Sequence, residues 1–284
     1  SRVLWLGQNC ARVLEGILAC ARLGAIFCPV NWRQTEAELE FVLADVEPSL
    51  VIWQHQEIGE AVLALRNKFA SAEQCWLQHD GANSEYEASL VAAAKPVNEW
   101  RGELNDPVLM LYTAAFSGKP NGALLSHRAV MAQSRIFAEV RKVTERACYL
   151  NVGPLFHVAT LLETMTTFQA GGSNVFIRRA EPQPICEAIE EEGCNGAFLL
   201  PPLIEKIIRY SQGHPVNLKS LCTLSDRPEW NALVTIDESP WGKRPYGFGQ
   251  TETFGYATYI SLAPDGLGSM GVSAPAVDVC MLDD

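Results

Sequence analysis

Four features that would place the 284-residue chain in a familiar class of protein are missing from its sequence. No apolar run approaches the roughly 20 residues that a membrane-spanning helix needs, and no signal peptide is recognisable. The nine cysteines are scattered singly without a C-x-x-C pair, which argues against a zinc site and a disulfide framework. The net charge of −11 argues against binding to nucleic acid, because phosphate backbones are bound by clustered lysine and arginine. We therefore expect free thiols, no transmembrane segment and a cytoplasmic location.

What the sequence does contain is a regular alternation of apolar runs and stretches with helical periodicity. Apolar residues recur at helical spacing over 13–21, and Gly24 can end that helix before an apolar run at 25–30. Thr35 and Glu38 form the capping-box pattern of another helix. Further strands are expected at 50–53, 74–77, 108–111, 148–152, 174–177 and 196–200, and further helices at 59–69, 126–140, 158–169, 184–192 and 203–210. This alternation predicts an α/β fold of mostly parallel sheets flanked by helices.

A first candidate loop lies at residues 112–122, which read Tyr-Thr-Ala-Ala-Phe-Ser-Gly-Lys-Pro-Asn-Gly. The loop follows the expected strand 108–111, so backbone N–H groups and the ammonium group of Lys119 can face an anion. It is not a Walker A loop, because Pro120 follows the lysine where that motif has Ser or Thr. Taken alone, the segment is either a phosphate-binding loop or a plain surface turn.

A second candidate loop lies at residues 246–252, which read Tyr-Gly-Phe-Gly-Gln-Thr-Glu. It combines an aromatic ring, a glycine-rich turn, a hydroxyl and a carboxylate, which suit a base, a phosphate and Mg²⁺ respectively. A third glycine-rich stretch, 266–271, fits G-x-G-x-x-G, but Pro264 and Pro275 leave no room for the strand and helix of a dinucleotide site. Stretch 266–271 is therefore rejected as a dinucleotide site, and the second loop stays a candidate.

In these two loops the chain resembles the adenylate-forming superfamily of acyl- and aryl-CoA synthetases, luciferases and peptide-synthetase adenylation domains. The family's phosphate loop reads roughly Tyr-Thr-Ser-Gly-Thr-Thr-Gly-Lys-Pro-Lys-Gly with Ser-His after it, and here Ser126 and His127 follow. The family's later motif reads Tyr-Gly-x-Thr-Glu. Residues 154–159, Pro-Leu-Phe-His-Val-Ala, and the segment 22–33 are similar to two further family segments. The motifs occur in the family's order along essentially the whole chain.

The resemblance implies a ligase that forms carbon-sulfur bonds. A carboxylic acid would first be joined to the α-phosphorus of ATP with release of pyrophosphate. The thiol of coenzyme A would then displace AMP and leave a thioester. ATP or AMP, Mg²⁺ and coenzyme A are therefore the expected ligands, and a small carboxylic acid is the expected substrate.

The resemblance also implies roles for individual residues. Thr251 is expected at the α-phosphate, Glu252 on Mg²⁺ and His157 beside the carboxylate of the acid. Phe248 is expected against the adenine, with Gly249 beside it. The remaining nucleotide-binding residues are expected at the β- and γ-phosphates: Thr113, Ser117, Gly118, Lys119 and Gly122. We expect Thr251, Glu252, Lys119 and His157 to take part in catalysis, whereas His127 is expected to have a structural role.

The domain organisation implied by the resemblance has three parts. Residues 1–105 would form part of a first α/β subdomain, 106–262 a second one with both loops, and 263–284 the start of a small β-rich subdomain. The family's mobile C-terminal domain, with its catalytic lysine, would lie outside the chain. The 284 residues alone would then be inactive or only partly active.

Departures from the family pattern keep other functions open. The phosphate loop has Ala114, Ala115, Phe116 and Asn121 where the family has Ser, Gly, Thr and Lys. Segment 223–230 also departs from the family's adenine-contacting loop. The alternatives are an adenylation domain that loads an acyl carrier protein and a non-catalytic adenylate-binding relative. Fatty, aryl and alicyclic acids all stay open as substrates, and so does the oligomeric state.

Overall fold

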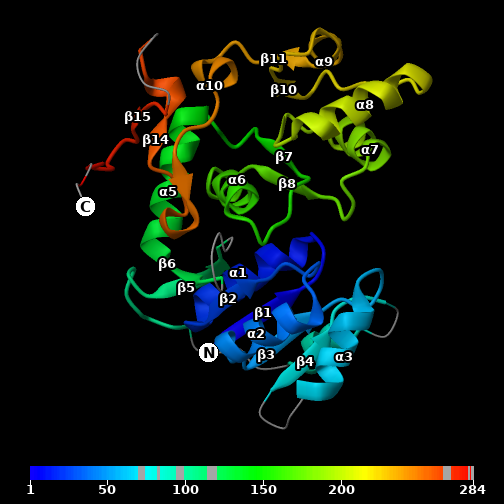
Figure 1. Cartoon of the computed structure of the whole chain (residues 1–284), viewed down its shortest axis with the longest axis vertical. Coiled ribbons are helices and arrows are strands. Elements are labelled where there is room, and N and C mark those ends of the chain that lie inside the picture. The colour runs from blue at the N-terminus through cyan, green and yellow to red at the C-terminus, as the bar shows by residue number, and fades with distance from the viewer. Residues whose placement is uncertain are drawn as a thin grey trace. The chain divides into compact units, whose positions relative to one another are not determined.

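The computed structural model describes residues 1–69, 74–81, 84–93, 99–113, 120–264, 270–280 and 282. The chain divides into two compact units, Ser1–His127 and Arg128–Asp284, and each is described by itself (Figure 1). All nine cysteines are free thiols. Among the described residues, no helix has both the length and the apolar character needed to cross a bilayer.

A six-stranded sheet with strand order β4-β3-β1-β2-β5-β6 forms the centre of the first unit. The first five strands in this order are parallel, whereas β6 runs antiparallel to β5. The strands are β1 (Arg2–Leu6), β2 (Ile26–Pro29), β3 (Leu50–Trp53), β4 (Cys75–Gln78), β5 (Pro107–Tyr112) and β6 (Gly122–Ser126).

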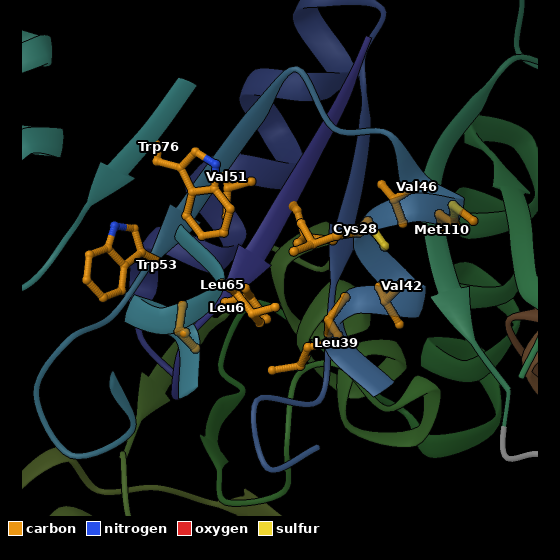
Figure 2. Packing of buried hydrophobic residues seen from close by; sticks show 14 residues of the cluster. Leu6, Cys28, Leu39, Val42, Val46, Val51, Trp53, Leu65, Trp76 and Met110 are labelled. Carbon is orange, nitrogen blue, oxygen red and sulfur yellow. The ribbon is translucent and has the colours of Figure 1, made fainter. Parts of the chain in front are cut away.

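Successive side chains of each strand point to opposite faces of the sheet. Apolar side chains lie on both faces, and helices cover both. On one face, Leu39, Val42 and Val46 of α2 (Glu36–Val46) pack in one cluster with Cys28 and with Leu65 of α3 (Gly59–Phe69) (Figure 2). On the other face, α1 (Ala11–Leu23) lies against β2, since a Cβ on Gly16 would stand only 2.5 Å from the ring of Phe27. A fourth helix, α4 (Glu85–Ala92), follows β4.

Local sequence signals explain where two of these helices begin and end. Gly24 has φ 65°, a conformation that costs glycine little, and it ends α1 with its N–H bonded to the carbonyl of Cys20. At the start of α2, the N–H of Thr35 donates to the Glu38 carboxylate (2.8 Å), and the N–H of Glu38 donates to the Thr35 hydroxyl (3.4 Å). Both features confirm the sequence-based prediction.

The second unit is built on a three-stranded parallel sheet of order β8-β7-β9 and on three small ladders. The ladders pair β10 with β11 in parallel, and β12 with β13 and β14 with β15 in antiparallel. The strands are β7 (Cys148–Asn151), β8 (Ser173–Phe176), β9 (Gly196–Ala197), β10 (Cys222–Thr223), β11 (Thr235–Ile236), β12 (Gly249–Gln250), β13 (Gly255–Tyr256), β14 (Thr258–Tyr259) and β15 (Val272–Ser273).

Helices of the second unit enclose a second apolar core. Buried Leu150 of β7, Ile189 and Ile207 lie in one cluster with Trp230. On α6, the hydroxyl of Thr164 donates to the Asn151 side chain of β7 (2.6 Å), which fixes that helix on the sheet. The helices are α5 (His127–Arg141), α6 (Val158–Gln169), α7 (Pro182–Glu192), α8 (Pro201–Gly213), α9 (Pro228–Leu233) and α10 (Pro240–Lys243), with short 3₁₀ turns η1 (Thr251–Thr253) and η2 (Ile260–Leu262).

The predicted fold class, parallel sheets flanked by helices, is confirmed, but two details differ. Residues 122–126 form the antiparallel strand β6, and α5 begins one residue later than expected, at His127. The first unit ends at His127 because β5 and β6 hydrogen-bond into its sheet, and a local sequence pattern does not report such pairing. The domain boundaries expected at 105/106 and 262/263 stay predictions.

Candidate functional site

The first candidate loop is the connection of the antiparallel hairpin β5–β6. Its residues 114–119, which include Ser117, Gly118 and Lys119, lie outside the described residues. At the neck of the hairpin, the N–H of Thr113 donates to the carbonyl of Asn121 (2.9 Å), and the N–H of Asn121 donates to the Thr113 hydroxyl (3.4 Å). The two ends of the loop are therefore held together by paired hydrogen bonds.

Gly122 fits this neck for a steric reason. A Cβ at this position would stand 2.1 Å from Cε of Met110, the far end of a flexible side chain. On the preceding strand, the hydroxyl of Tyr112 donates to the carboxylate of Asp45 on α2 (2.5 Å). Burial and this hydrogen bond raise the pKa of Tyr112, so its hydroxyl keeps its proton.

The second candidate loop forms a hairpin in which η1 connects β12 to β13. Gly249 pairs with Tyr256 and Gln250 with Gly255, so Thr251 and Glu252 lie at the tip. The Glu252 side chain is exposed and Thr251 is half-buried. The tip can therefore present a hydroxyl and a carboxylate to a ligand.

This hairpin is closed by very near approaches of backbone to backbone. A Cβ on Gly247 would stand 1.9 Å from the carbonyl oxygen of Thr258, and one on Gly249 would stand 2.4 Å from that of Gly255. Only glycine fits at such positions without moving the main chain. The two glycines of the motif are therefore required by the fold of the hairpin itself.

Two aromatic residues in and beside the hairpin have different surroundings. Phe254 is fully buried, whereas 49% of Phe248 is exposed. The N–H of Phe248 donates to the Thr258 hydroxyl (3.0 Å), which fixes the backbone from which the ring projects. Phe248 is therefore not part of the apolar core, whereas Phe254 is.

His157 is the N-cap of α6. Its ring Nδ1 accepts a hydrogen bond from the N–H of Ala159 (3.2 Å), and partial burial of the ring lowers its pKa. A neutral imidazole is required for this bond, because a protonated Nδ1 has no lone pair. His127, in contrast, stacks on Trp100 with ring centroids 5.3 Å apart, as expected of a structural residue.

The second unit also contains a cavity of about 490 Å³ beyond the carboxyl ends of β9, β10 and β11. Segments 197–199 and 222–226 and Asp237, which lie at or just beyond these strand ends, line it. Ligands of parallel α/β sheets are found at this edge. The sequence pointed to segment 223–230 through its place along the chain and to Tyr246 as the first residue of the second candidate loop, but the other lining residues gave no signal.

One buried ion pair, Arg141 with Glu163, lies in the wall of this cavity. Only 17% of the arginine side chain and 10% of the glutamate side chain are exposed. Burial raises the pKa of Glu163 and Arg141 opposes that rise, while the charge of Glu163 raises the pKa of Arg141 against the effect of burial. Sequence reasoning missed the pair, because its partners are 22 residues apart on two helices.

No cluster of three or more His, Cys, Asp or Glu side chains with metal-binding geometry occurs in the part of the chain that the structure describes. Mg²⁺ is commonly held by one or two carboxylates together with substrate phosphates, so an exposed carboxylate such as Glu252 fits this ion.

Comparison with known proteins identifies the family. The sequence model described as AMP-binding enzyme matches residues 1–284. The chain belongs to this family. Indoleacetate-CoA ligase from Aromatoleum aromaticum is 29% identical over 299 residues, which cover 100% of this chain and 57% of that protein. Feruloyl-CoA synthase from an Amycolatopsis species is 30% identical over 227 residues, which cover 78% of this chain and 43% of that protein.

A solved structure shares the fold of this family member. The inhibitor-bound N-terminal domain of FACL13 from Mycobacterium tuberculosis matches 96% of the chain with a TM-score of 0.76 at 21% identity, over 69% of its own chain. The chain spans about half the length of the curated relatives it matches. The family and the fold are thereby established.

Proposed function

We propose that the chain is the nucleotide-binding part of a ligase that activates a carboxylic acid with ATP and transfers the acyl group to coenzyme A. The hairpin that presents Thr251 and Glu252 at its tip, in a chain of the AMP-binding family, is the observation that carries this proposal. The first unit would add Lys119 and its neighbours from the β5–β6 hairpin.

The proposed reaction has two steps. A carboxylate oxygen attacks the α-phosphorus of ATP, the bond to the bridging oxygen breaks, and pyrophosphate leaves. The sulfur of coenzyme A then attacks the acyl carbon after losing its proton, and AMP leaves with the electrons of the broken carbon-oxygen bond. Both steps depend mainly on positioning and on stabilisation of the charge that develops on oxygen.

Within this scheme Thr251 would donate to the α-phosphate, and Phe248 would stack on the adenine beside Gly249. Glu252 would hold Mg²⁺, which supplies positive charge to the phosphate oxygens when bound. Thr113, Ser117, Gly118, Lys119 and Gly122 would surround the β- and γ-phosphates.

His157 would stand beside the acid as a neutral imidazole. Its lowered pKa keeps a cation away from the carboxylate and leaves Nδ1 engaged with the backbone. We therefore assign it a role in shaping the acyl pocket and do not assign it proton transfer.

For the acid, we propose an aromatic ring as the first class to test. Two relatives of this chain act by name on indoleacetate and on the feruloyl group.

The test measures binding of ATP and then exchange of labelled pyrophosphate into ATP with Mg²⁺ and a panel of aryl, fatty and alicyclic acids. Exchange that depends on an aryl acid would support the proposal. Binding of ATP without exchange for any acid would favour a non-catalytic adenylate-binding protein, the alternative that Ala115, Phe116 and Asn121 motivate. Transfer to a carrier protein but not to free coenzyme A would favour the carrier-loading alternative.

A further inference from the structure

The position of the tip of the β12–β13 hairpin depends on the side chains that pack against the other end of the hairpin. Tyr246 is the first residue of the second candidate loop, and Tyr256 lies on β13 at the other end of the hairpin. Both rings contact Trp241, with centroid distances of 6.5 Å for Tyr246 and 6.0 Å for Tyr256. The segment that carries Thr251 and Glu252 is therefore held at both ends by the same indole ring.

Further rings extend this base into a cluster. Phe137 of α5 stacks on Tyr256 (5.8 Å) and on Tyr259 (6.3 Å), and it meets Trp241 edge to face (5.2 Å). Phe137 and Tyr259 are at most 1% exposed. We call Phe137, Trp241, Tyr246, Tyr256 and Tyr259 the aromatic base of the hairpin.

The buried Arg141–Glu163 ion pair lies against this aromatic base. The guanidinium carbon of Arg141 is 5.5 Å from the ring centroid of Phe137, one turn earlier on α5, and 5.5 Å from that of Trp241. A planar guanidinium stacks on ring faces, and its bond to Glu163 fixes its orientation. The pair thereby connects α5, α6 and α10 beneath one hairpin.

Stability alone does not account for such a pair. Two charges lose their hydration when they are buried, and well-packed apolar residues often stabilise a core as much or more. A buried ion pair does impose one orientation on the groups around it. This device is useful where a loop must hold a fixed position relative to a ligand.

We infer that Arg141 and Glu163 are positioning residues for the Thr251–Glu252 tip, acting through Trp241 and Tyr256. The inference rests on the proposed function, because the tip is assigned to the nucleotide there. Neither side chain is assigned a contact with ATP.

The test separates positioning from stability with a double substitution, Arg141→Met with Glu163→Leu. Each single change leaves one buried charge without its partner, so both Tm and affinity for AMP should fall. The double change removes both charges, so we expect the Tm to return to within about 4 °C of the parent. Affinity for AMP, measured by calorimetry, should stay about tenfold weaker.

A matched control is available on the same helix. Arg135 and Glu139 form an ion pair on α5 with N and O 3.5 Å apart, and 78% and 60% of their side chains are exposed. Arg135→Met with Glu139→Leu should change neither Tm nor AMP affinity appreciably, because exposed pairs contribute little. A folded Arg141→Met/Glu163→Leu protein that binds AMP as tightly as the parent would overturn the inference.

Two additional measurements keep the inference testable. If the double variant does not fold, Arg141→Lys retains the charge but not the planar group over two rings, and it should weaken AMP binding at least threefold with the fold intact; unchanged affinity would refute the inference. If the parent itself binds no nucleotide, the proposed function fails. Amide exchange in the Gln250–Gly255 pair then decides: it should quicken in the Arg141 variants and not in the control, and equal exchange would refute the positioning role.

Discussion

Two hairpins carry the residues expected to bind the nucleotide, and they are held in different ways. The neck of β5–β6 is closed by backbone hydrogen bonds and the Thr113 hydroxyl, and its Gly122 faces the flexible end of Met110. The hairpin β12–β13 is closed by glycines that face carbonyl oxygens and stands on a buried aromatic base. The β5–β6 hairpin can accommodate a larger side chain at Gly122, whereas the β12–β13 hairpin cannot accommodate one at Gly247 or Gly249 without moving its main chain. The contrast predicts a steep difference in tolerance to mutation.

The largest effect is expected at the tip of the second hairpin. Glu252→Gln removes the proposed ligand of Mg²⁺, whose charge stabilisation is worth several kcal/mol, so acid-dependent pyrophosphate exchange should fall about 100-fold or more. The side chain is exposed, so the Tm should not change. Glu191→Gln on α7, also exposed, is the control and should leave exchange intact. Unchanged turnover in Glu252→Gln would remove this residue from the mechanism.

Gly247→Ala should have the next largest effect. A Cβ there would stand 1.9 Å from the carbonyl oxygen of Thr258, and relief requires a shift of the main chain. Overpacking of this kind costs about 1–3 kcal/mol, and we expect the upper end of that range in urea unfolding. A loss below about 0.5 kcal/mol, typical of surface substitutions, would show that the hairpin is not closed as described.

The matched change in the first hairpin, Gly122→Ala, should be milder. The atom that would meet the new methyl group is Cε of Met110, which can rotate away. We expect a loss of about 1 kcal/mol or less in the same unfolding measurement. An equal loss of unfolding free energy for Gly122→Ala and Gly247→Ala would show that the two hairpins do not differ in their tolerance of side-chain volume.

The smallest effect is a pH dependence at His157. The folded-state pKa is lowered from the ordinary 6.5, so the neutral ring is favoured in the folded protein. Its contribution is complete above pH 6.5 and is lost as pH falls through the folded pKa, when Nδ1 can no longer accept the Ala159 N–H. Solvent screening keeps the loss below about 1 kcal/mol. His157→Asn, which retains a cap acceptor, should flatten this part of the stability-pH curve; an unaltered curve would contradict the assignment.

Local signals in the sequence were sufficient for part of this account. The capping box at Thr35 and the stop at Gly24 depend only on neighbouring residues, so they could be predicted and are confirmed. The Thr251–Glu252 motif was found because its residues are contiguous. Their placement at a hairpin tip depends on Gly249, which the sequence showed only as part of a glycine-rich turn, and on Gly255, which lies outside the motif.

Contacts between distant segments could not be predicted. Strand β6 is five residues long and begins with glycine, so its sequence alone does not indicate a strand; its pairing with β5 makes it one. Arg141 and Glu163 each have the appearance of an ordinary charged residue on an amphipathic helix. Their burial follows from how α5, α6 and α10 pack around the aromatic base, which no periodicity reports.

The most direct test of the central claim is amide hydrogen exchange with and without ATP and Mg²⁺. If both hairpins hold one nucleotide, peptides that cover 107–126 and 246–256 should both exchange more slowly when it is bound, and Glu252→Gln should weaken both effects together. Slower exchange in only one of these segments, or in neither at saturating nucleotide, would contradict the account.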